Sequence, residues 1–348
     1  MVTATPHCFV IAEAGVNHNG DEALAHELIE AAVQAGANAV KFQTFHADLL
    51  AAPSAAKAAY QQEMTGVGDQ RSMLRALELP DAAYARLAQH CSERRIEFMS
   101  TPFDETAADM LVALGMQRIK IPSGEVTNFP FLEHLAASGR PLILSTGMST
   151  LDEVAAATAC IEAVWRRSSP PQAQAPLTAL HCTSNYPAKA ADVNLRAMLT
   201  MHTALQLPVG YSDHTLGISV ALAAVALGAC VIEKHFTLDR NLAGPDHRAS
   251  LEPTELAALV REIRLVETAL GSAVKQPTAS ELPVRDVVRR SVSLRRPVAA
   301  GEYLDARDLI LLRPGTGIAP AALARVAGRR AARDMEAGTT LHWDDLAE

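Results

Sequence analysis

The chain has 348 residues, of which 49% are hydrophobic and 20% charged, so it can bury a large core and is not a disordered protein. Its formal net charge of -8, with no basic block, argues against nucleic acid as a partner. No apolar run reaches the roughly 18 residues that span a bilayer, and residues 1–6 lack a signal-peptide pattern. The five cysteines form no Cys-x-x-Cys pair, which favours free thiols in a reducing cytoplasm.

Short β-rich runs alternate with helical patterns from residue 9 to about residue 271. Asp21 can cap a helix that ends at Gly36, and Thr150 with Glu153 has the spacing of a capping box. A third helix is expected at 253–270. The predicted strands are 9–15, 39–44, 97–101, 118–122, 141–146, 177–183, 208–212 and 230–236. Eight strands alternating with helices predict a (β/α)8 barrel, and no Gly-x-Gly-x-x-Gly follows the first strand to favour a doubly wound sheet.

The C-terminal part of the chain differs from the rest in its residue composition and sequence pattern. Residues 275–285 are polar and proline-containing, which suits a linker between a barrel domain (1–274) and a small domain (286–348). The small domain contains a weak internal repeat. Ala300-Gly301, Leu304 and Asp308-Leu309 have the same spacing as Ala337-Gly338, Leu341 and Asp345-Leu346. Two such turn-containing units predict a pseudo-symmetric β-rich domain, with coincidence as the alternative.

Polar side chains follow every predicted strand of the barrel. In this fold the active site lies at the carboxyl ends of the strands. Polar groups gathered there are costly unless a ligand or a network satisfies them. In chain order they are Glu13, Asn17, Lys41, Gln43, Thr101, Lys120, Ser123, Glu125, Ser145, Thr146, Ser184, Asn185, Tyr186, Ser212, Asp213, His214, Glu233 and His235.

Two of these residues, Lys41 and Lys120, lie inside otherwise apolar strands. A closed barrel has no edge strand from which a lysine could reach water. Two inward lysines beside Ser123, Ser145 and Ser212 predict a pocket for a phosphate or a carboxylate. A Schiff base at Lys120 stays open, because a desolvated lysine can act as a nucleophile.

His214 and His235 lie at the ends of neighbouring strands. Two neutral imidazoles with open coordination positions suit a divalent first-row metal that also accepts substrate oxygens. The alternative is a pair of histidines satisfied within the core. The nearby carboxylates can transfer protons, bind hydroxyl groups or orient the lysines and histidines, and the sequence does not separate these roles. They are Glu13, Glu125, Glu233 and Asp246.

The motifs at the strand ends resemble, in order and along the whole chain, those of the sialic acid synthases. The opening motif is Ile11-Ala12-Glu13-Ala14-Gly15-Val16-Asn17-His18-Asn19-Gly20. The others are Val40-Lys41-Phe42-Gln43-Thr44, Lys120-Ile121-Pro122-Ser123-Gly124-Glu125, Ser145-Thr146-Gly147-Met148, His181-Cys182-Thr183-Ser184-Asn185-Tyr186-Pro187, Gly210-Tyr211-Ser212-Asp213-His214-Thr215, Glu233-Lys234-His235-Phe236-Thr237 and Gly244-Pro245-Asp246. The tail, with Arg313-Pro314-Gly315, resembles the family's SAF (antifreeze-like) domain.

The resemblance implies an enzyme that condenses phosphoenolpyruvate with an N-acetylated hexose aldehyde, releasing phosphate and giving a nine-carbon 2-keto acid. His214 and His235 would hold Mn²⁺, or else Mg²⁺ or Co²⁺, against the aldehyde oxygen; with Glu13, Lys41 and Lys120 they form the expected catalytic set. Phosphoenolpyruvate would be surrounded by Lys41, Lys120, Ser123, Ser145, Ser184 and Ser212. The sugar would face Glu13, Asn17, Gln43, Tyr186, Asp246 and Arg313.

The resemblance also implies a domain-swapped homodimer, in which Arg313 acts on the sugar bound by the partner's barrel. The first motif, Ala14-Gly15-Val16-Asn17, departs from the form associated with pseudaminic acid synthases. N-acetylneuraminate formation from N-acetylmannosamine is the default expectation, and legionaminic acid formation from a 2,4-diacetamido-2,4,6-trideoxy-mannose is the alternative. We expect the specificity loop within residues 52–72. More distant alternatives are a barrel acting on a phosphorylated sugar, a Schiff-base aldolase and a non-catalytic sugar- or ice-binding protein.

Overall fold

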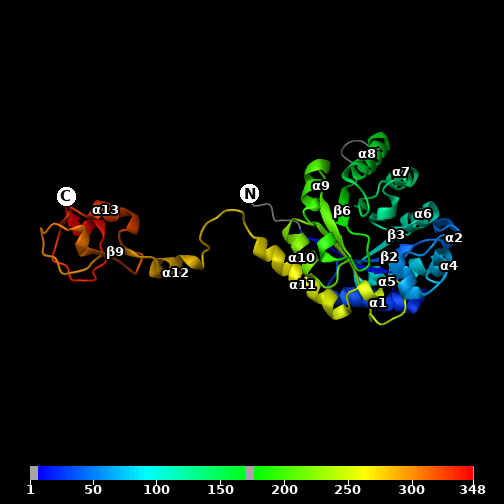
Figure 1. Ribbon diagram of the computed structural model, residues 1–348, viewed down its shortest axis with the longest axis horizontal. Helices are drawn as coiled ribbons and strands as arrows, with labels where there is room; N and C mark the ends of the chain where they lie inside the picture. The colour runs from blue at the N-terminus through cyan, green and yellow to red at the C-terminus, as the bar shows by residue number, and fades with distance from the viewer. Residues whose placement is uncertain (1–6, 169–175, 348) are drawn as a thin grey trace. The chain divides into compact units, whose positions relative to one another are not determined.

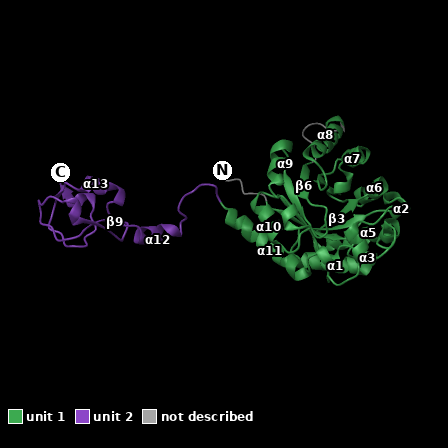
Figure 2. Cartoon of the chain, viewed as in Figure 1, with its two compact units in different colours: residues 1–271 green, residues 272–348 purple. Residues whose placement is uncertain are grey.

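The computed structural model describes residues 7–168 and 176–347, in two compact units, Met1–Gly271 and Ser272–Glu348 (Figure 2). The first unit is an eight-stranded parallel sheet surrounded by helices, with strand order β3-β2-β1-β8-β7-β6-β5-β4 (Figure 1). The end strands β3 and β4 pack against each other. Arg118, just before β4, forms a 2.7 Å ion pair with Glu97 of β3, so the sheet is a nearly closed barrel, as predicted.

The eight predicted strands are all present, with bounds within one residue of those expected. They are β1 (Phe9–Gly15), β2 (Ala39–Thr44), β3 (Glu97–Pro102), β4 (Ile119–Ile121), β5 (Leu142–Ser145), β6 (Leu177–Cys182), β7 (Val209–Asp213) and β8 (Val231–His235). The helices of this unit are α1 (Glu22–Ala35), α2 (Ala47–Leu50), α3 (Ala59–Thr65), α4 (Gln70–Arg75), α5 (Asp81–Arg94), α6 (Glu105–Ala113), α7 (Phe129–Ala137), α8 (Leu151–Ser168), α9 (Ala197–Leu205), α10 (Ser219–Ala226) and α11 (Pro253–Leu270).

The helix-end signals in the sequence are confirmed. The Asp21 carboxylate accepts a hydrogen bond from the backbone N–H of Ala23, and Gly36 ends α1 in the left-handed conformation at φ +76°. The Glu153 carboxylate accepts from the backbone N–H of Thr150 at 2.7 Å, and the Thr150 hydroxyl accepts from that of Glu153 at 3.3 Å. These caps satisfy backbone N–H groups that have no partner within the helix.

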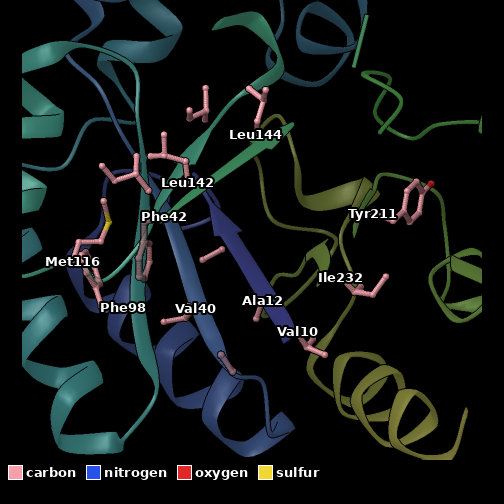
Figure 3. Close-up of a cluster of buried hydrophobic side chains, with 14 of the residues drawn as sticks. Val10, Ala12, Val40, Phe42, Phe98, Met116, Leu142, Leu144, Tyr211 and Ile232 are labelled. Carbon is pink, nitrogen blue, oxygen red and sulfur yellow. The ribbon is translucent and has the colours of Figure 1, made fainter. Parts of the chain in front are cut away.

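Side chains along each strand alternate between two environments. One set points outward and packs against the helices; Val10, Ala12, Val40, Phe42 and Ile232 belong to it (Figure 3). The other set fills the barrel interior with an apolar layer made by Ile11, Ala39, Met99, Ile143, Leu180 and Val231. Two residues further along the same strands, the inward positions hold Glu13, Lys41, Thr101, Ser145, Cys182 and Glu233. The strand period therefore places the polar groups above the apolar floor, at the carboxyl end of the barrel.

The second unit has its own small apolar core. Its elements are α12 (Glu281–Val288), β9 (Ser291–Leu294), β10 (Leu309–Leu312), α13 (Leu323–Val326), β11 (Arg330–Ala331) and β12 (Leu346–Ala347). Residues 275–285, expected as a linker, include the first residues of α12. The weak internal repeat has a structural counterpart. Asp308 accepts a hydrogen bond from Arg296 at 2.7 Å, and Asp345 at the matching position accepts one from Arg333 at 2.8 Å.

Two expectations from composition can be compared with this structure. The five cysteines are free thiols, as expected, and three of them, Cys8, Cys91 and Cys182, are buried. No helix within residues 7–168 and 176–347 has the length and apolar character needed to cross a membrane.

Candidate active site

A cavity of about 440 Å³ lies at the carboxyl ends of the barrel strands. Twelve of the predicted site residues line it together, which brings the phosphate-binding, sugar-binding and metal-binding candidates into one space. They are Glu13, Lys41, Gln43, Lys120, Ser123, Ser145, Ser184, Tyr186, Ser212, His214, His235 and Asp246.

Two predicted sugar-binding residues do not line this cavity. Asn17 is buried, and its side-chain amide donates to the Phe236 carbonyl at 2.8 Å and to the Ser250 hydroxyl at 3.0 Å. It therefore ties the loop after β1 to the loop after β8. Arg313 belongs to the second unit, where it is exposed at the end of β10 beside Arg290. Its contact with the sugar stays a prediction.

Four buried charged side chains form one ion-pair network inside the barrel, which we call the interior cluster: Glu13, Lys41, Lys120 and Glu233. The Lys41 ammonium lies 2.6 Å from Glu13 and 3.6 Å from Glu233, and the Lys120 ammonium lies 3.3 Å from Glu233. Lys41 also donates to the Thr101 hydroxyl at 2.8 Å. Glu233 therefore contacts both lysines of the site, whereas the sequence alone did not assign it one role among proton transfer, hydroxyl binding and orientation of other groups. It precedes His235 by two residues on β8, so strand parity alone places it in the barrel interior.

Burial and the two lysines set different pKa values for the two glutamates. Burial raises the pKa of Glu13 to about 7, against the opposing effect of Lys41. Burial also acts to raise the pKa of Glu233, but Lys120 and Lys41 together outweigh it and lower that pKa to about 2. Glu233 is therefore ionised at neutral pH, whereas Glu13 exchanges its proton there. A carboxyl group that titrates near pH 7 is suited to general acid and base chemistry.

Small polar groups surround a narrow space next to Gly147. The Ser123 hydroxyl accepts from the Gly147 backbone N–H at 2.9 Å. A methyl group added at Gly147 would come within 2.2 Å of the Ser184 oxygen, so only glycine leaves this space open. The Ser145 hydroxyl is buried without a hydrogen-bond partner among the described residues. Serine hydroxyls beside two lysines form a suitable lining for an anion.

His214 and His235 present lone pairs that fit a metal ion. The Nδ1 of His214 lies 2.7 Å from the Thr183 carbonyl, which can only accept, so Nδ1 carries the proton and Nε2 has the lone pair. The Ser212 hydroxyl lies 3.4 Å from this Nε2, but it donates its proton to Glu233 at 2.9 Å. The Nδ1 of His235 is buried and has no partner in the described part of the chain. Burial lowers the pKa of His214 to about 4 and that of His235 well below its usual value, so both rings are neutral at pH 7. Their ring centroids are 5.6 Å apart.

No group of three or more His, Cys, Asp or Glu side chains in the described residues is arranged to hold a metal. Two imidazoles alone would leave most coordination positions to water or substrate oxygens. Such an open arrangement is typical of catalytic rather than structural metal sites. The described residues therefore fit a divalent ion that also contacts the substrate.

Aromatic rings connect the histidines to the segment between β2 and α5. The Tyr186 ring lies 4.1 Å from the His214 ring and 5.2 Å from the Tyr60 ring, measured between centroids. Asp246 lines the same part of the cavity, and burial raises its pKa to about 6. Tyr60 belongs to α3, within residues 52–72, where the sequence predicted a specificity loop from the interruption at Tyr60-Gln61-Gln62-Glu63-Met64. Short irregular helices give no periodic pattern from which inward positions could be read.

Comparison with known proteins places this geometry in a family. Residues 28–275 match the NeuB family and residues 289–347 match the SAF domain. The chain belongs to the NeuB family. The N,N'-diacetyllegionaminic acid synthase of Legionella pneumophila is 52% identical over 97% of this chain and 94% of that protein. The N,N'-diacetyllegionaminic acid synthase of Campylobacter jejuni is 46% identical over 89% of this chain and 91% of that protein.

A solved structure of an N-acetylneuraminic acid (sialic acid) synthetase from Leptospira borgpetersenii is also similar. It has a TM-score of 0.69 and 36% sequence identity, and the match covers 80% of this chain and 90% of that one. The resemblance to the sialic acid synthases and the (β/α)8 fold with a SAF domain are thus confirmed.

Proposed function

We propose that this member of the NeuB family condenses phosphoenolpyruvate with 2,4-diacetamido-2,4,6-trideoxy-mannose and water, giving N,N'-diacetyllegionaminic acid and phosphate. The observation that carries the reaction class is the interior cluster beside two neutral imidazoles in one cavity. The choice of sugar is supported by the two legionaminic acid synthases, 52% and 46% identical over most of this chain. It replaces the default expectation of N-acetylneuraminate, and N-acetylmannosamine becomes the second candidate substrate.

Lys41 and Lys120 bind the phosphate and carboxylate groups of phosphoenolpyruvate. Both are buried and paired with carboxylates, so they are already held in position when the anion arrives. The hydroxyls of Ser123, Ser145 and Ser184 complete this end of the site. Their donors are fixed by the barrel and need little reorganisation on binding.

The residues that would hold a divalent ion are His214 and His235, with Mn²⁺ as the first choice and Mg²⁺ or Co²⁺ as alternatives. When bound, such an ion supplies Lewis-acid polarisation of the sugar's aldehyde carbonyl. The Thr183 carbonyl fixes the tautomer and orientation of His214, which keeps Nε2 available as a ligand.

The reaction forms a bond between C3 of phosphoenolpyruvate and the aldehyde carbon. The aldehyde oxygen becomes a hydroxyl by taking a proton from Glu13, whose raised pKa makes the acid form available at neutral pH. Water then adds at C2 and gives one proton back to the Glu13 carboxylate, and the tetrahedral intermediate releases phosphate as its C2 hydroxyl becomes the 2-keto group. Gln43, which donates to Glu13 at 3.2 Å, and Asp246 orient the sugar.

We further propose, following the family resemblance, that the enzyme is a homodimer in which Arg313 binds the sugar in the partner's barrel. The Arg313→Ala and His214→Ala variants should each be inactive or nearly so. Mixed dimers of the two should regain activity, because one barrel then combines intact histidines with an intact arginine from its partner. No recovery in mixed dimers would remove the trans role of Arg313.

One observation favours the Schiff-base alternative, since burial lowers the pKa of Lys120 and so promotes its neutral amine form. Borohydride treatment in the presence of the 2-keto acid product separates the two mechanisms. The condensation mechanism predicts no covalent adduct at Lys120. A trapped adduct on Lys120 would favour the aldolase.

The experiment that tests the proposed function is phosphate release from phosphoenolpyruvate with a panel of N-acetylated sugars, followed by the mass of the product. Release should depend on sugar and be fastest with the diacetamido trideoxy sugar. Faster release with N-acetylmannosamine would support the second candidate. Absence of sugar-dependent release with every member of the panel would contradict the reaction class.

A further inference from the structure

The segment between β2 and α5 forms a distinct wall of the cavity. Instead of passing directly from strand to helix, the chain makes the three short helices α2, α3 and α4. Apolar side chains of this segment line the cavity, among them Phe45, Leu50, Met73, Leu74 and Leu77. They pack with Val16 and Phe103, which also line the cavity, in a small apolar cluster separate from the barrel core. The side chains of this wall are therefore held in place by packing.

Two amide side chains, Gln61 and Gln70, also line the cavity from this segment. Gln61 Oε1 accepts from the Ala58 backbone N–H at 3.0 Å, and a Gln70 Nε2–H group donates to the same oxygen at 3.4 Å. Because only an oxygen can accept from a backbone N–H, these contacts fix the orientation of both amides. The Gln61 NH2 group and the Gln70 carbonyl oxygen are left to face other partners. The pair thus offers a donor and an acceptor side by side.

The wall contributes no charged side chain to the cavity. The ionisable carboxylates and ammonium groups of the lining, Glu13, Lys41, Lys120, Glu233 and Asp246, come from the strands or the loop after β8. A phosphate or a hydroxyl group placed against the leucines would lose hydration without a compensating partner. An acetamido group matches the wall better, because it is neutral and has one N–H donor, one carbonyl acceptor and a methyl group.

We propose that this wall selects the substituents at C4 and C6 of the sugar. Gln61 and Gln70 hydrogen-bond the 4-acetamido group, and Leu50, Met73, Leu74 and Leu77 enclose its methyl group and the C6 methyl group. The Tyr60 ring lies 5.2 Å from the Tyr186 ring, and the Tyr186 ring lies 4.1 Å from that of His214, so the wall is one aromatic ring beyond the histidines. This inference rests on the proposed condensation and identifies which residues choose its sugar.

The test compares kcat/KM for the diacetamido trideoxy sugar and for N-acetylmannosamine in wild type and variants. Gln61→Glu keeps the oxygen that accepts from Ala58 but removes both N–H donors. It should lower kcat/KM for the diacetamido sugar about tenfold or more, as expected for an unpaired amide, and change that for N-acetylmannosamine less than about threefold. Leu74→Gln should reduce the same preference. KM for phosphoenolpyruvate should stay unchanged in both variants.

Gln62→Glu is the matched control. It makes the same change of charge in the same helix, but Gln62 is exposed and does not line the cavity. It should preserve the wild-type preference. If the Gln61 and Leu74 variants lower kcat/KM equally for both sugars, or if wild type prefers N-acetylmannosamine, the wall does not select these substituents, although the condensation stands. If wild type uses neither sugar, the proposed function fails and the inference fails with it.

Discussion

Strands β7 and β8 carry buried charges on both faces, and the two sets differ in their hydrogen bonding. Outside the barrel, Lys234 forms an ion pair with Asp213 at 2.8 Å and donates to the Thr215 carbonyl. The other Asp213 oxygen accepts from the Thr215 backbone, the Thr215 hydroxyl and the Tyr211 hydroxyl at 2.9, 2.8 and 3.2 Å. We call Tyr211, Asp213, Thr215 and Lys234 the outer cluster. In it, every carboxylate oxygen and the ammonium group have partners.

The interior cluster contains the same types of charge but is incompletely satisfied. Glu233 Oε2 of this cluster is buried without a hydrogen bond within residues 7–168 and 176–347, and the Lys41 ammonium lies 3.6 Å from it. Beside the cluster, the Ser145 hydroxyl and His235 Nδ1 are likewise buried without hydrogen bonds in this part of the chain. Unpaired buried polar atoms cost stability, and they gather where a ligand supplies the missing partners. The comparison teaches that burial of charge alone does not indicate function. An unsatisfied network opening into a cavity does.

The largest expected effect is loss of activity on removing either imidazole of the cavity. His214→Ala and His235→Ala should each lower kcat about 10³-fold or more, and a chelator should do the same to wild type, with recovery on adding Mn²⁺. His202→Ala, at an exposed position on α9, is the control and should leave turnover unchanged. Full turnover of wild type in excess chelator would contradict a metal role.

Removing one partner of the outer cluster should affect folding. Lys234→Met leaves the Asp213 carboxylate buried without its counter-charge, which should lower the free energy of unfolding by about 3–5 kcal/mol. Urea titration of the metal-free protein measures this loss. The double variant Asp213→Asn with Lys234→Met should recover part of the loss, since no uncompensated charge remains; a double variant as unstable as the sum of its single changes would argue against the pair acting as a unit.

Gly147→Ala tests the narrow space beside the serines. The added methyl group would lie 2.2 Å from Ser184 Oγ and 3.0 Å from Ser123 Oγ, so this side of the pocket must shift. KM for phosphoenolpyruvate should rise about 100-fold, with little change in KM for the sugar. Gly124→Ala adds a methyl group to the lining of the same cavity where no protein atom lies within 4 Å, so it controls for the added group without moving the serines. A larger effect on the sugar than on phosphoenolpyruvate would place the anion elsewhere.

The smallest effect concerns stability against acid. Burial lowers the pKa of His18 and of His247 to about 4, from an ordinary value of 6.5. Below pH 6.5 the unfolded chain binds protons that the folded chain does not, so stability present above pH 6.5 is lost as the pH falls toward 4. At pH 5.5 each histidine should lower the free energy of unfolding by about 1.2 kcal/mol relative to pH 7. His247→Gln should flatten the slope of unfolding free energy against pH; an unchanged slope would show that His247 does not titrate this way.

Much of the fold could be predicted because its local signals are strong. Eight β-rich runs with caps such as Asp21 and Thr150 between them determine a barrel, and the strand period determines which residues face inward. This period correctly predicted that Lys41 and Lys120 point into one cavity. Applied to β8, it also places Glu233 on the same inward face as His235.

Other parts of the site depend on contacts that no local pattern reveals. Asn17 follows β1 in the sequence, but its hydrogen bonds to the loop after β8 turn it away from the cavity lining. Gln61 and Gln70 lie on short helices whose inward faces have no regular spacing. The two legionaminic acid synthases favour the alternative sugar over the default expectation. The motifs that carry the resemblance lie at the strand ends, so they give no information on the side chains that we propose to select the sugar.

The most direct test of the central claim is calorimetric titration of phosphoenolpyruvate into wild type, Lys120→Met and Lys234→Met, with urea unfolding of the same samples. The account predicts that Lys120→Met weakens binding about 100-fold while remaining folded, because it removes a cation from the anion pocket. Lys234→Met should be much less stable yet bind phosphoenolpyruvate within about threefold of wild type when folded. Wild-type affinity in Lys120→Met, together with lost affinity in folded Lys234→Met, would contradict the assignment of the interior cluster as the active site.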